Sequence, residues 1–546
     1  MVLDIITKKP TEYKTWQWAT LMTIGMLTAA LPAIFLSSYS INEVDEPYQI
    51  LNAMDWENAV YSPLSSWLAN KFGHFVSWKY LSFRYLSVFL NFLGIFISSI
   101  YALYASKRKK LITISAIITT LLALSFKNLT HYYVWDNWTT CCMSFCIILF
   151  ISLIHKFTWW KLIGIGVAAS LTSLMRIPNI SVFLFSILIL AYSDLNRRVC
   201  FYKIAVFILV FFISLFAILK FLYGDIAVYF EIFSNNQIGD HSVIHIIKPL
   251  LLRFLVALIY ACLLGLSYWC LKITDRVNKR RRVWLYFLLT VVLSVSILPS
   301  RGFTFGMGSA FCLGLILLTL FILICKSQLQ GSRRLLLVVS VIFLFSLGAG
   351  IGSNGGFSKA LVWPLFPLII WLLGHDFRGS LRKLYIICAI SYCIFSAIGI
   401  THYNFLDERL SRLSYTFKEE DTVLTGMHTN PERGEFIMKI YKDSKPFLNN
   451  GYTPIVLRQG NDFIYEYIMR HPNKYQRHTF SNWWAFWDKK YVESIQEEIK
   501  TSKEPVFVLY RQWIDSENIP PMLKMLQENT KCVVNEPGYS IWIKDK

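Results

Sequence analysis

The chain has 546 residues, of which 55% are hydrophobic and only 16% are charged, and its mean hydropathy is +0.45. Soluble globular proteins carry about a quarter charged residues, so the composition excludes an ordinary soluble protein. The net charge of +20 would suit a nucleic-acid-binding protein, but its distribution argues against that class. The first 401 residues hold 34 basic and 14 acidic residues, and the remainder holds 20 of each.

Apolar segments of roughly 17 to 25 residues recur along the first 401 residues, and this length crosses a bilayer as a helix. Basic residues gather in short loops between them, as in Lys107-Arg108-Lys109-Lys110 and Lys279-Arg280-Arg281-Arg282. This positive-inside pattern predicts a polytopic membrane protein whose basic loops are cytoplasmic. We predict about 13 spans: Trp16–Ser38, Leu81–Tyr104, Leu111–Phe126, Trp138–Ile154, Leu162–Met175, Ile180–Ala191, Ile204–Leu222, Leu250–Leu271, Val283–Leu298, Ala310–Cys325, Leu335–Ile351, Ala360–Leu373 and Leu384–Ile400.

The predicted fold class is an α-helical polytopic membrane protein with a small extracytoplasmic α/β domain. An odd number of spans, with a cytoplasmic N-terminus, leaves the C-terminal region outside. We therefore expect a transmembrane domain over 1–401 and a soluble domain over 402–546. Its predicted strands are Thr422–Leu424, Pro505–Tyr510 and Tyr539–Lys544, and its predicted helices are Val492–Lys500 and Pro521–Glu528.

The first external loop, 39–80, concentrates acidic residues. Five of the 14 acidic residues in the first 401 positions fall between Glu43 and Glu57. Pro47 and Pro63 suit the first turns of two short helices along the membrane surface, which would put Asp45 at the head of the first helix. Because a carboxylate at the edge of the hydrocarbon is costly, the cluster is a candidate active site, with Asp55 and Glu57 as solvated loop charges.

This loop resembles the GT-C class of membrane glycosyltransferases, specifically the protein O-mannosyltransferase and lipid A aminoarabinose transferase group. The likeness covers about the first 90 residues and departs from the aminoarabinose transferases at Ala59-Val60-Tyr61-Ser62. Neither the identity of the sugar nor a metal site is therefore carried over. The matching residues are Asp45-Glu46, Tyr48, Ser62-Pro63-Leu64-Ser65-Ser66-Trp67-Leu68, Phe72-Gly73, Arg84 and Leu86-Ser87.

The resemblance implies transfer of a sugar from a polyprenyl-phosphate donor to an external glycan, lipid or protein acceptor. Attack by an acceptor hydroxyl needs a carboxylate to accept its proton, so we predict Asp45 as general base, with Glu46 assisting or positioning the acceptor. The departing phosphate needs electrostatic stabilisation. Predicted substrate-binding residues on the outer face are Tyr48, Asp136, Arg176, Arg301 and Lys359.

Several of these residues have structural alternatives. Asp136 suits acceptor or metal binding, or the N-cap of the fourth span. Arg176 interrupts an apolar hairpin, so it suits either a ligand phosphate or a buried ion pair. Arg84, near the outer end of the second span, suits contact with lipid headgroups or support of the first loop. A divalent cation is left open as a cofactor, and no metal ligands are assigned.

The expected partners are the lipid-linked sugar, its acceptor and membrane lipid, with no nucleic acid. We expect a protein of the bacterial inner membrane whose active site and C-terminal domain are periplasmic. One alternative is an O-antigen ligase or polymerase, which would depend on a late periplasmic loop instead. A second is a lipid-linked sugar transporter or flippase, for which internal repeats and mid-span ionisable residues would be expected.

Overall fold

The structure is a computed structural model. It describes residues 14–105, 132–193, 196–235, 243–274, 279–297, 307–325, 332–350, 380–402, 409–418, 422–457, 462–469, 487–511 and 520–544, together with residues 114, 118, 122 and 125.

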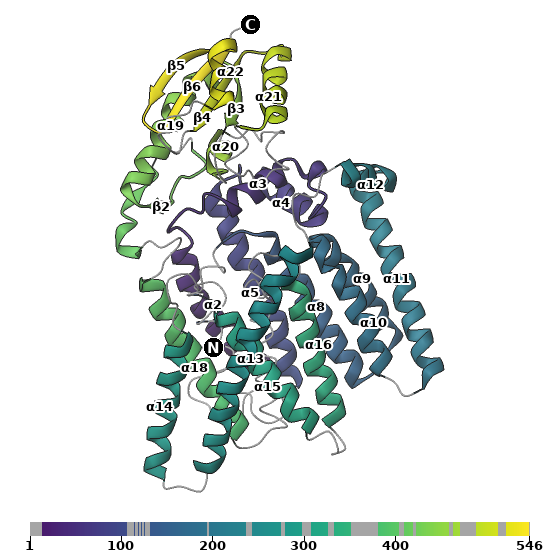
Figure 1. Cartoon of the computed structure of the whole chain (residues 1–546). Coiled ribbons are helices and arrows are strands. Elements are labelled where there is room, and N and C mark those ends of the chain that lie inside the picture. Colours follow the sequence, from purple (N-terminus) through teal and green to yellow (C-terminus); the bar gives the residue numbers. More distant parts are fainter. Residues whose placement is uncertain are drawn as a thin grey trace.

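Long apolar helices form a bundle below the rest of the molecule in Figure 1. Each predicted span within the described residues coincides with one of them, whereas most of Leu111–Phe126 and all of Ala360–Leu373 lie outside those residues. The helices are α2 (Thr15–Leu36), α5 (Tyr80–Ala105), α8 (Trp135–His155), α9 (Trp159–Met175), α10 (Ser181–Ser193), α11 (Arg197–Tyr223), α13 (Val243–Thr274), α14 (Lys279–Ile297), α15 (Met307–Cys325), α16 (Ser332–Gly350) and α18 (Ser380–His402).

Within the described ranges, five of these helices, α2, α5, α8, α11 and α13, contain stretches long and apolar enough to cross a membrane. Large apolar side chains such as Leu209, Phe221 and Ile259 are exposed on the bundle. Exposed apolar surface of this extent suits contact with lipid. The chain is therefore an integral membrane protein, and the total of about 13 spans stays a prediction.

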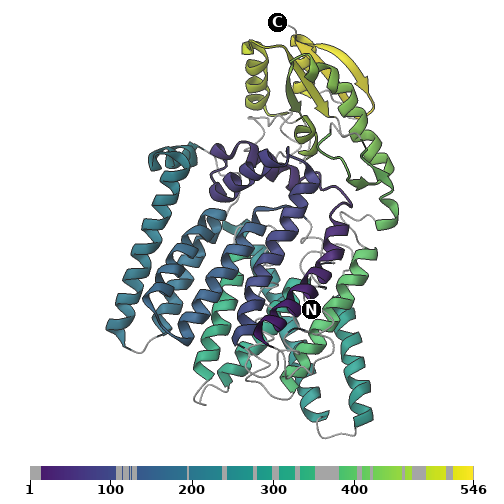
Figure 2. The same ribbon diagram turned by 180° about the vertical axis from the view of Figure 1, so that it is seen from behind.

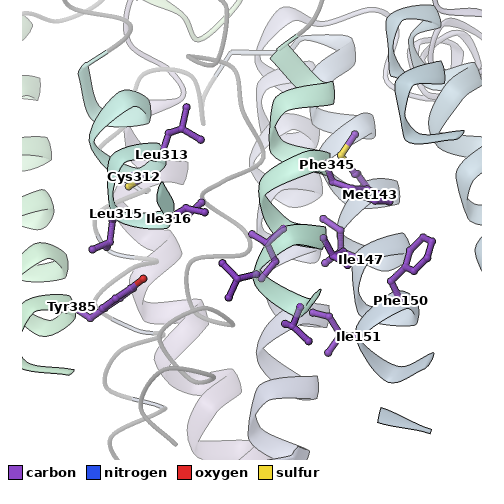
Figure 3. Close-up of a cluster of buried hydrophobic side chains, with 14 of the residues drawn as sticks. Met143, Ile147, Phe150, Ile151, Cys312, Leu313, Leu315, Ile316, Phe345 and Tyr385 are labelled. Carbon is purple, nitrogen blue, oxygen red and sulfur yellow. The ribbon is translucent and has the colours of Figure 1, made fainter. Parts of the chain in front are cut away.

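The bundle core is apolar. Helix α8 packs against α5, α9 and α16, and α13 packs against α15. In Figure 3, Met143 of α8 lies beside Phe345 of α16, and the rings of Phe150 and Phe345 are 5.5 Å apart between centroids. The buried Tyr385 of α18 keeps its hydroxyl satisfied by a 2.5 Å hydrogen bond with Thr319 of α15.

Loop 39–80, predicted to be the first external loop, lies across one end of the bundle, between the helices and the C-terminal region (Figures 1 and 2). It contains α3 (Asp45–Met54), the short 3-10 helix η2 (Trp56–Asn58) and α4 (Pro63–Phe75). Both surface helices were predicted. Pro63 is the first residue of α4, where its missing N–H costs nothing. Helix α3 begins two residues before Pro47, so Asp45 stands at its head as expected.

The C-terminal region contains a four-stranded sheet in the order β3-β4-β6-β5. Strands β3 and β4 are parallel, and the other two pairs are antiparallel. A two-stranded ribbon of β1 (Tyr415–Thr416) and β2 (His428–Thr429) precedes it. The other elements are α19 (Pro431–Asn449), β3 (Thr453–Leu457), α20 (Ile464–Met469), α21 (Lys489–Thr501), β4 (Val506–Arg511), α22 (Pro521–Asn529), β5 (Lys531–Glu536) and β6 (Tyr539–Lys544).

The central strand β4 is buried along its whole length because both faces of the sheet are covered. Val506, Val508 and Tyr510 pack with α21 and α22 on one face. Phe507 and Leu509 point the other way, into a core shared with α19 and with the first external loop. That shared core includes Ile41, Ile50 and Leu51 of the loop, Phe83 of α5, and Ile437 of α19. The C-terminal region is therefore docked on the first loop through a continuous apolar core.

The predictions for this region were partly wrong. Thr422–Leu424 is a turn rather than a strand. The strands β4 and β6 and the helices α21 and α22 match their predicted ranges to within a few residues. Strands β3 and β5 were not predicted, because β3 carries Pro454 and β5 is a polar edge strand. Helix α19 was also not predicted.

Candidate functional site

Asp45 lies at the start of α3 with its side chain exposed. The backbone is fixed there by Asn42, whose Oδ1 accepts hydrogen bonds from the amides of Val44 at 2.8 Å and Asp45 at 2.9 Å. Negative charge in the first turn of a helix is favoured by the free amide groups and the helix dipole. Among the described residues, no side chain donates a hydrogen bond to the Asp45 carboxylate. The arrangement presents an accessible anion at a fixed place on loop 39–80.

Glu46, the next residue, is in the opposite situation, because its side chain is fully buried. Arg84 of α5 donates to both carboxylate oxygens, from Nε at 3.1 Å and from Nη2 at 2.6 Å. The Tyr80 hydroxyl donates at 2.5 Å, and the Tyr133 amide donates at 2.8 Å. A carboxylate held by four donors has its acceptor capacity filled. Glu46 therefore suits a positioning role, and no oxygen of it is presented to solvent.

Arg84 joins the end of the first span to this cluster. Its Nη1 donates to the carbonyl oxygens of Ser37 at 3.1 Å and Tyr39 at 2.8 Å, and its side chain is fully buried. Of the two alternatives for Arg84, the structure favours support of the first loop over contact with lipid headgroups. The cluster ties together α2, α3, α5 and the segment before α8, so it fixes the backbone that carries Asp45.

Two tyrosines lie beside Asp45 and Glu46. The half-buried ring of Tyr48 packs against Phe463 at 4.8 Å between centroids. Burial raises the pKa of the Tyr132 hydroxyl strongly; Arg84 opposes the rise, and the carboxylates of Glu46 and Asp45 add to it. Tyr132 is therefore a neutral phenol at physiological pH, within electrostatic reach of Asp45.

Asp136 and Arg176 form a second buried ion pair. Arg176 Nη1 lies 3.2 Å from Asp136 Oδ1, and each side chain is 9% exposed. Asp136 is the second residue of α8, whose N-cap is Val134, so the predicted N-cap role is wrong. Arg176 precedes the short 3-10 helix η3 (Ile177–Ile180), where Asn179 Nδ2 donates to Thr139 Oγ1 at 3.0 Å. The pairing matches the structural alternative for Arg176.

We expect Asp136→Asn to lower the free energy of unfolding by about 3 kcal/mol, because it leaves the Arg176 guanidinium buried beside a neutral amide. Thermal unfolding in detergent measures the change. Glu57→Gln, which removes an exposed carboxylate of the outer loop, is the matched control and should leave the transition in place. An Asp136→Asn protein as stable as the control would show that the pair contributes nothing.

The other two predicted substrate cations, Arg301 and Lys359, lie outside the described residues. Within the described part of the chain, no group of three or more His, Cys, Asp or Glu side chains is arranged to hold a metal ion. The two described cations discussed above, Arg84 and Arg176, are both engaged in buried ion pairs.

Sequence reasoning missed four contributors to the site: Asn42, Tyr80, the Tyr133 amide and Arg433. Asn42 had a local signal, since an Asn two to three residues before a helix start commonly accepts backbone amides. The other three had none. Tyr80 is 34 residues from Glu46 along the chain, and Tyr133 is 87 residues away. Arg433 lies in α19, where its Nε is 2.8 Å from Glu43 Oε1.

No protein-family model matches the sequence, and no curated protein matches it. The crystal structure of ArnT from Cupriavidus metallidurans in the apo state is similar, with 13% identity, 96% of this chain and 98% of that chain covered, and a TM-score of 0.46. The oligosaccharyltransferase of Archaeoglobus fulgidus, in complex with Zn and sulfate, is 10% identical over 95% of this chain and 72% of its own, with a TM-score of 0.40.

The archaeal oligosaccharyltransferase AglB from Archaeoglobus fulgidus, in complex with an inhibitory peptide and a dolichol-phosphate, is 11% identical over 90% of this chain and 69% of its own, with a TM-score of 0.42.

Proposed function

We propose that the protein is a membrane glycosyltransferase that moves a sugar from a polyprenyl-phosphate donor to an extracytoplasmic glycan, lipid or protein acceptor. Asp45 is the general base that accepts the proton of the acceptor hydroxyl as it attacks the anomeric carbon. The sugar–phosphate bond breaks, and the polyprenyl phosphate leaves as an anion, which requires positive charge rather than a general acid.

The observation that carries the proposal is the contrast between two adjacent carboxylates. Glu46 is buried and held by Arg84, Tyr80 and the Tyr133 amide. Asp45 stands exposed at the head of a surface helix fixed by that cluster. A rigid support under one accessible carboxylate is the arrangement that proton abstraction requires, because the base must be within hydrogen-bond reach of its substrate.

The remaining site residues are assigned by what their surroundings allow. We propose Tyr48 as an acceptor contact, since it follows Asp45 by one helical turn. Arg301 and Lys359 are the proposed cations for the donor phosphate. Asp136 and Arg176 are better suited to supporting the loop, because they neutralise each other in a buried pair.

The proposed arrangement in the cell follows the charge pattern of the loops. The transmembrane domain spans 1–401 in the inner membrane of a bacterium, with loop 39–80 and the C-terminal domain, 402–546, on the periplasmic side. The C-terminal domain lies over the first loop, so it is suited to binding the acceptor. The candidate cofactor is a divalent cation.

Deletion of the gene, followed by profiling of glycolipids and glycoproteins, tests the function. One envelope glycan should lose a sugar and regain it on expression of the wild-type chain. The purified protein in liposomes should release polyprenyl phosphate from a polyprenyl-phosphate sugar in the presence of the acceptor so identified. An unchanged glycan profile, or donor turnover without dependence on the protein, would contradict the proposal.

A further inference from the structure

We infer that the C-terminal region positions Asp45, and that the Glu43–Arg433 ion pair is the link through which it does so. This inference rests on the proposed role of Asp45 as the base. It concerns residues outside the proposed catalytic and substrate-binding set, and it predicts that catalysis depends on a contact between loop 39–80 and the C-terminal region.

The ion pair joins the segment before Asp45 to the first turn of α19. Arg433 Nε lies 2.8 Å from Glu43 Oε1, with the two side chains 26% and 16% exposed. The start of α19 is capped by Asn430, whose Oδ1 accepts the amide of Arg433 at 3.0 Å. A pair that is mostly shielded from water is weakened less by solvent and salt than a surface pair.

Asp45 is held on both sides by the same region. The carbonyl oxygen of Glu43 accepts the amide of Ile464, at the start of α20, at 3.2 Å. Three residues after Asp45, the ring of Tyr48 packs on Phe463. The segment 43–48 is therefore held at Glu43 by Arg433 of α19 and Ile464 of α20, and at Tyr48 by Phe463, with the exposed carboxylate of Asp45 between these contacts.

The C-terminal region also holds the turn that delivers Tyr80 to Glu46. Ser77 and Trp78 in this turn have positive φ values of 54° and 58°, which are unfavourable for residues with a side chain. The Tyr467 hydroxyl donates to the carbonyl oxygen of Trp78, and the Tyr80 amide donates to the Val423 carbonyl oxygen at 2.9 Å. Strained residues persist where their surroundings over-determine them, and here part of those surroundings is the C-terminal region.

A displacement of α19 should therefore move Asp45 without unfolding either part. Because misplacing a reacting group by about 1 Å can reduce the rate by roughly 100-fold, we expect Arg433→Glu to lower kcat by roughly 10- to 100-fold and to change KM much less. Exchanging the charges, Glu43→Arg with Arg433→Glu, should restore most of the lost kcat, since opposite charges again face each other.

Lys439→Glu is the matched control. It makes the same charge change on the same helix, at a pair with Glu536 that lies within the C-terminal region, and it should leave kcat unchanged. Equal losses in Arg433→Glu and Lys439→Glu, or no recovery in the exchanged pair, would overturn the inference.

Hydrogen–deuterium exchange gives a readout that does not depend on activity. The amides of Val44 and Asp45 are bonded to Asn42 Oδ1, so their peptide should exchange slowly in the wild type and in Lys439→Glu. It should exchange faster in Arg433→Glu and slowly again in the exchanged pair. If exchange follows this pattern while the wild type transfers no sugar, the proposed function fails and the structural link stands. If exchange in Arg433→Glu equals that of the wild type, the link is refuted whatever the activity.

Discussion

Asp45→Asn is expected to lower kcat for sugar transfer by roughly 10²- to 10⁴-fold, the usual contribution of a general base. The amide has nearly the shape of the carboxylate but cannot accept a proton from the acceptor hydroxyl. The first turn of α3 should persist, because Asn42 bonds the backbone amide of Asp45 rather than its side chain. Transfer of labelled sugar from a polyprenyl-phosphate donor, measured in liposomes, checks the result.

Asp55→Asn is the matched control for this experiment. Asp55 lies at the other end of the same helix, where it accepts hydrogen bonds from Asn58 Nδ2 at 2.9 and 3.1 Å. It carries the same charge in the same loop and should show kcat close to that of the wild type. Normal transfer by a well-folded Asp45→Asn protein would remove Asp45 from the mechanism. Loss of transfer in both variants would indicate a general effect of negative charge in the loop.

Arg84→Met is expected to lower the free energy of unfolding by about 3–5 kcal/mol, the cost of leaving one partner of a buried ion pair alone. Met retains much of the volume of the side chain but none of its donors. Glu46 would keep only Tyr80 and the Tyr133 amide, and the carbonyl groups of Ser37 and Tyr39 would lose Nη1 of Arg84. Thermal unfolding in detergent, and the yield of folded protein, measure the loss.

The double variant Glu46→Gln with Arg84→Met separates the ion pair from simple packing. Removing both charges should be less damaging than the sum of the two single changes, because no unpaired charge stays buried. Lys79→Met changes an exposed lysine directly before α5; it is the control and should have little effect. If the two single losses added fully in the double variant, Glu46 and Arg84 would be acting independently.

Local sequence patterns were sufficient to predict the membrane helices and the start of helix α3 at Asp45. Each apolar span predicted from its length is a helix where the structure describes it, because crossing a bilayer requires backbone hydrogen bonds within the segment. Pro47, close after Asp45, predicted a helix start at the acidic cluster, and α3 begins at Asp45. Strands β4 and β6 were recognisable from runs of Val, Ile and aromatic residues, whereas β3 carries Pro454 and β5 is a polar edge strand.

Patterns of neighbouring residues were enough to identify a helical membrane protein with an unusual group of carboxylates in its first loop. Apolar length, loop charge and helix start signals are properties of neighbouring residues, so they can be read without a fold. The family resemblance favoured Asp45 over Glu46, but only the tertiary structure showed the physical difference between them, because the burial and ion pairing of Glu46 depend on Tyr80 and Arg84 of α5 and on the Tyr133 amide before α8. Glu46 is the buried support because Arg84, 38 residues away in the sequence, pairs with it. Asp45 faces solvent, next to the C-terminal region.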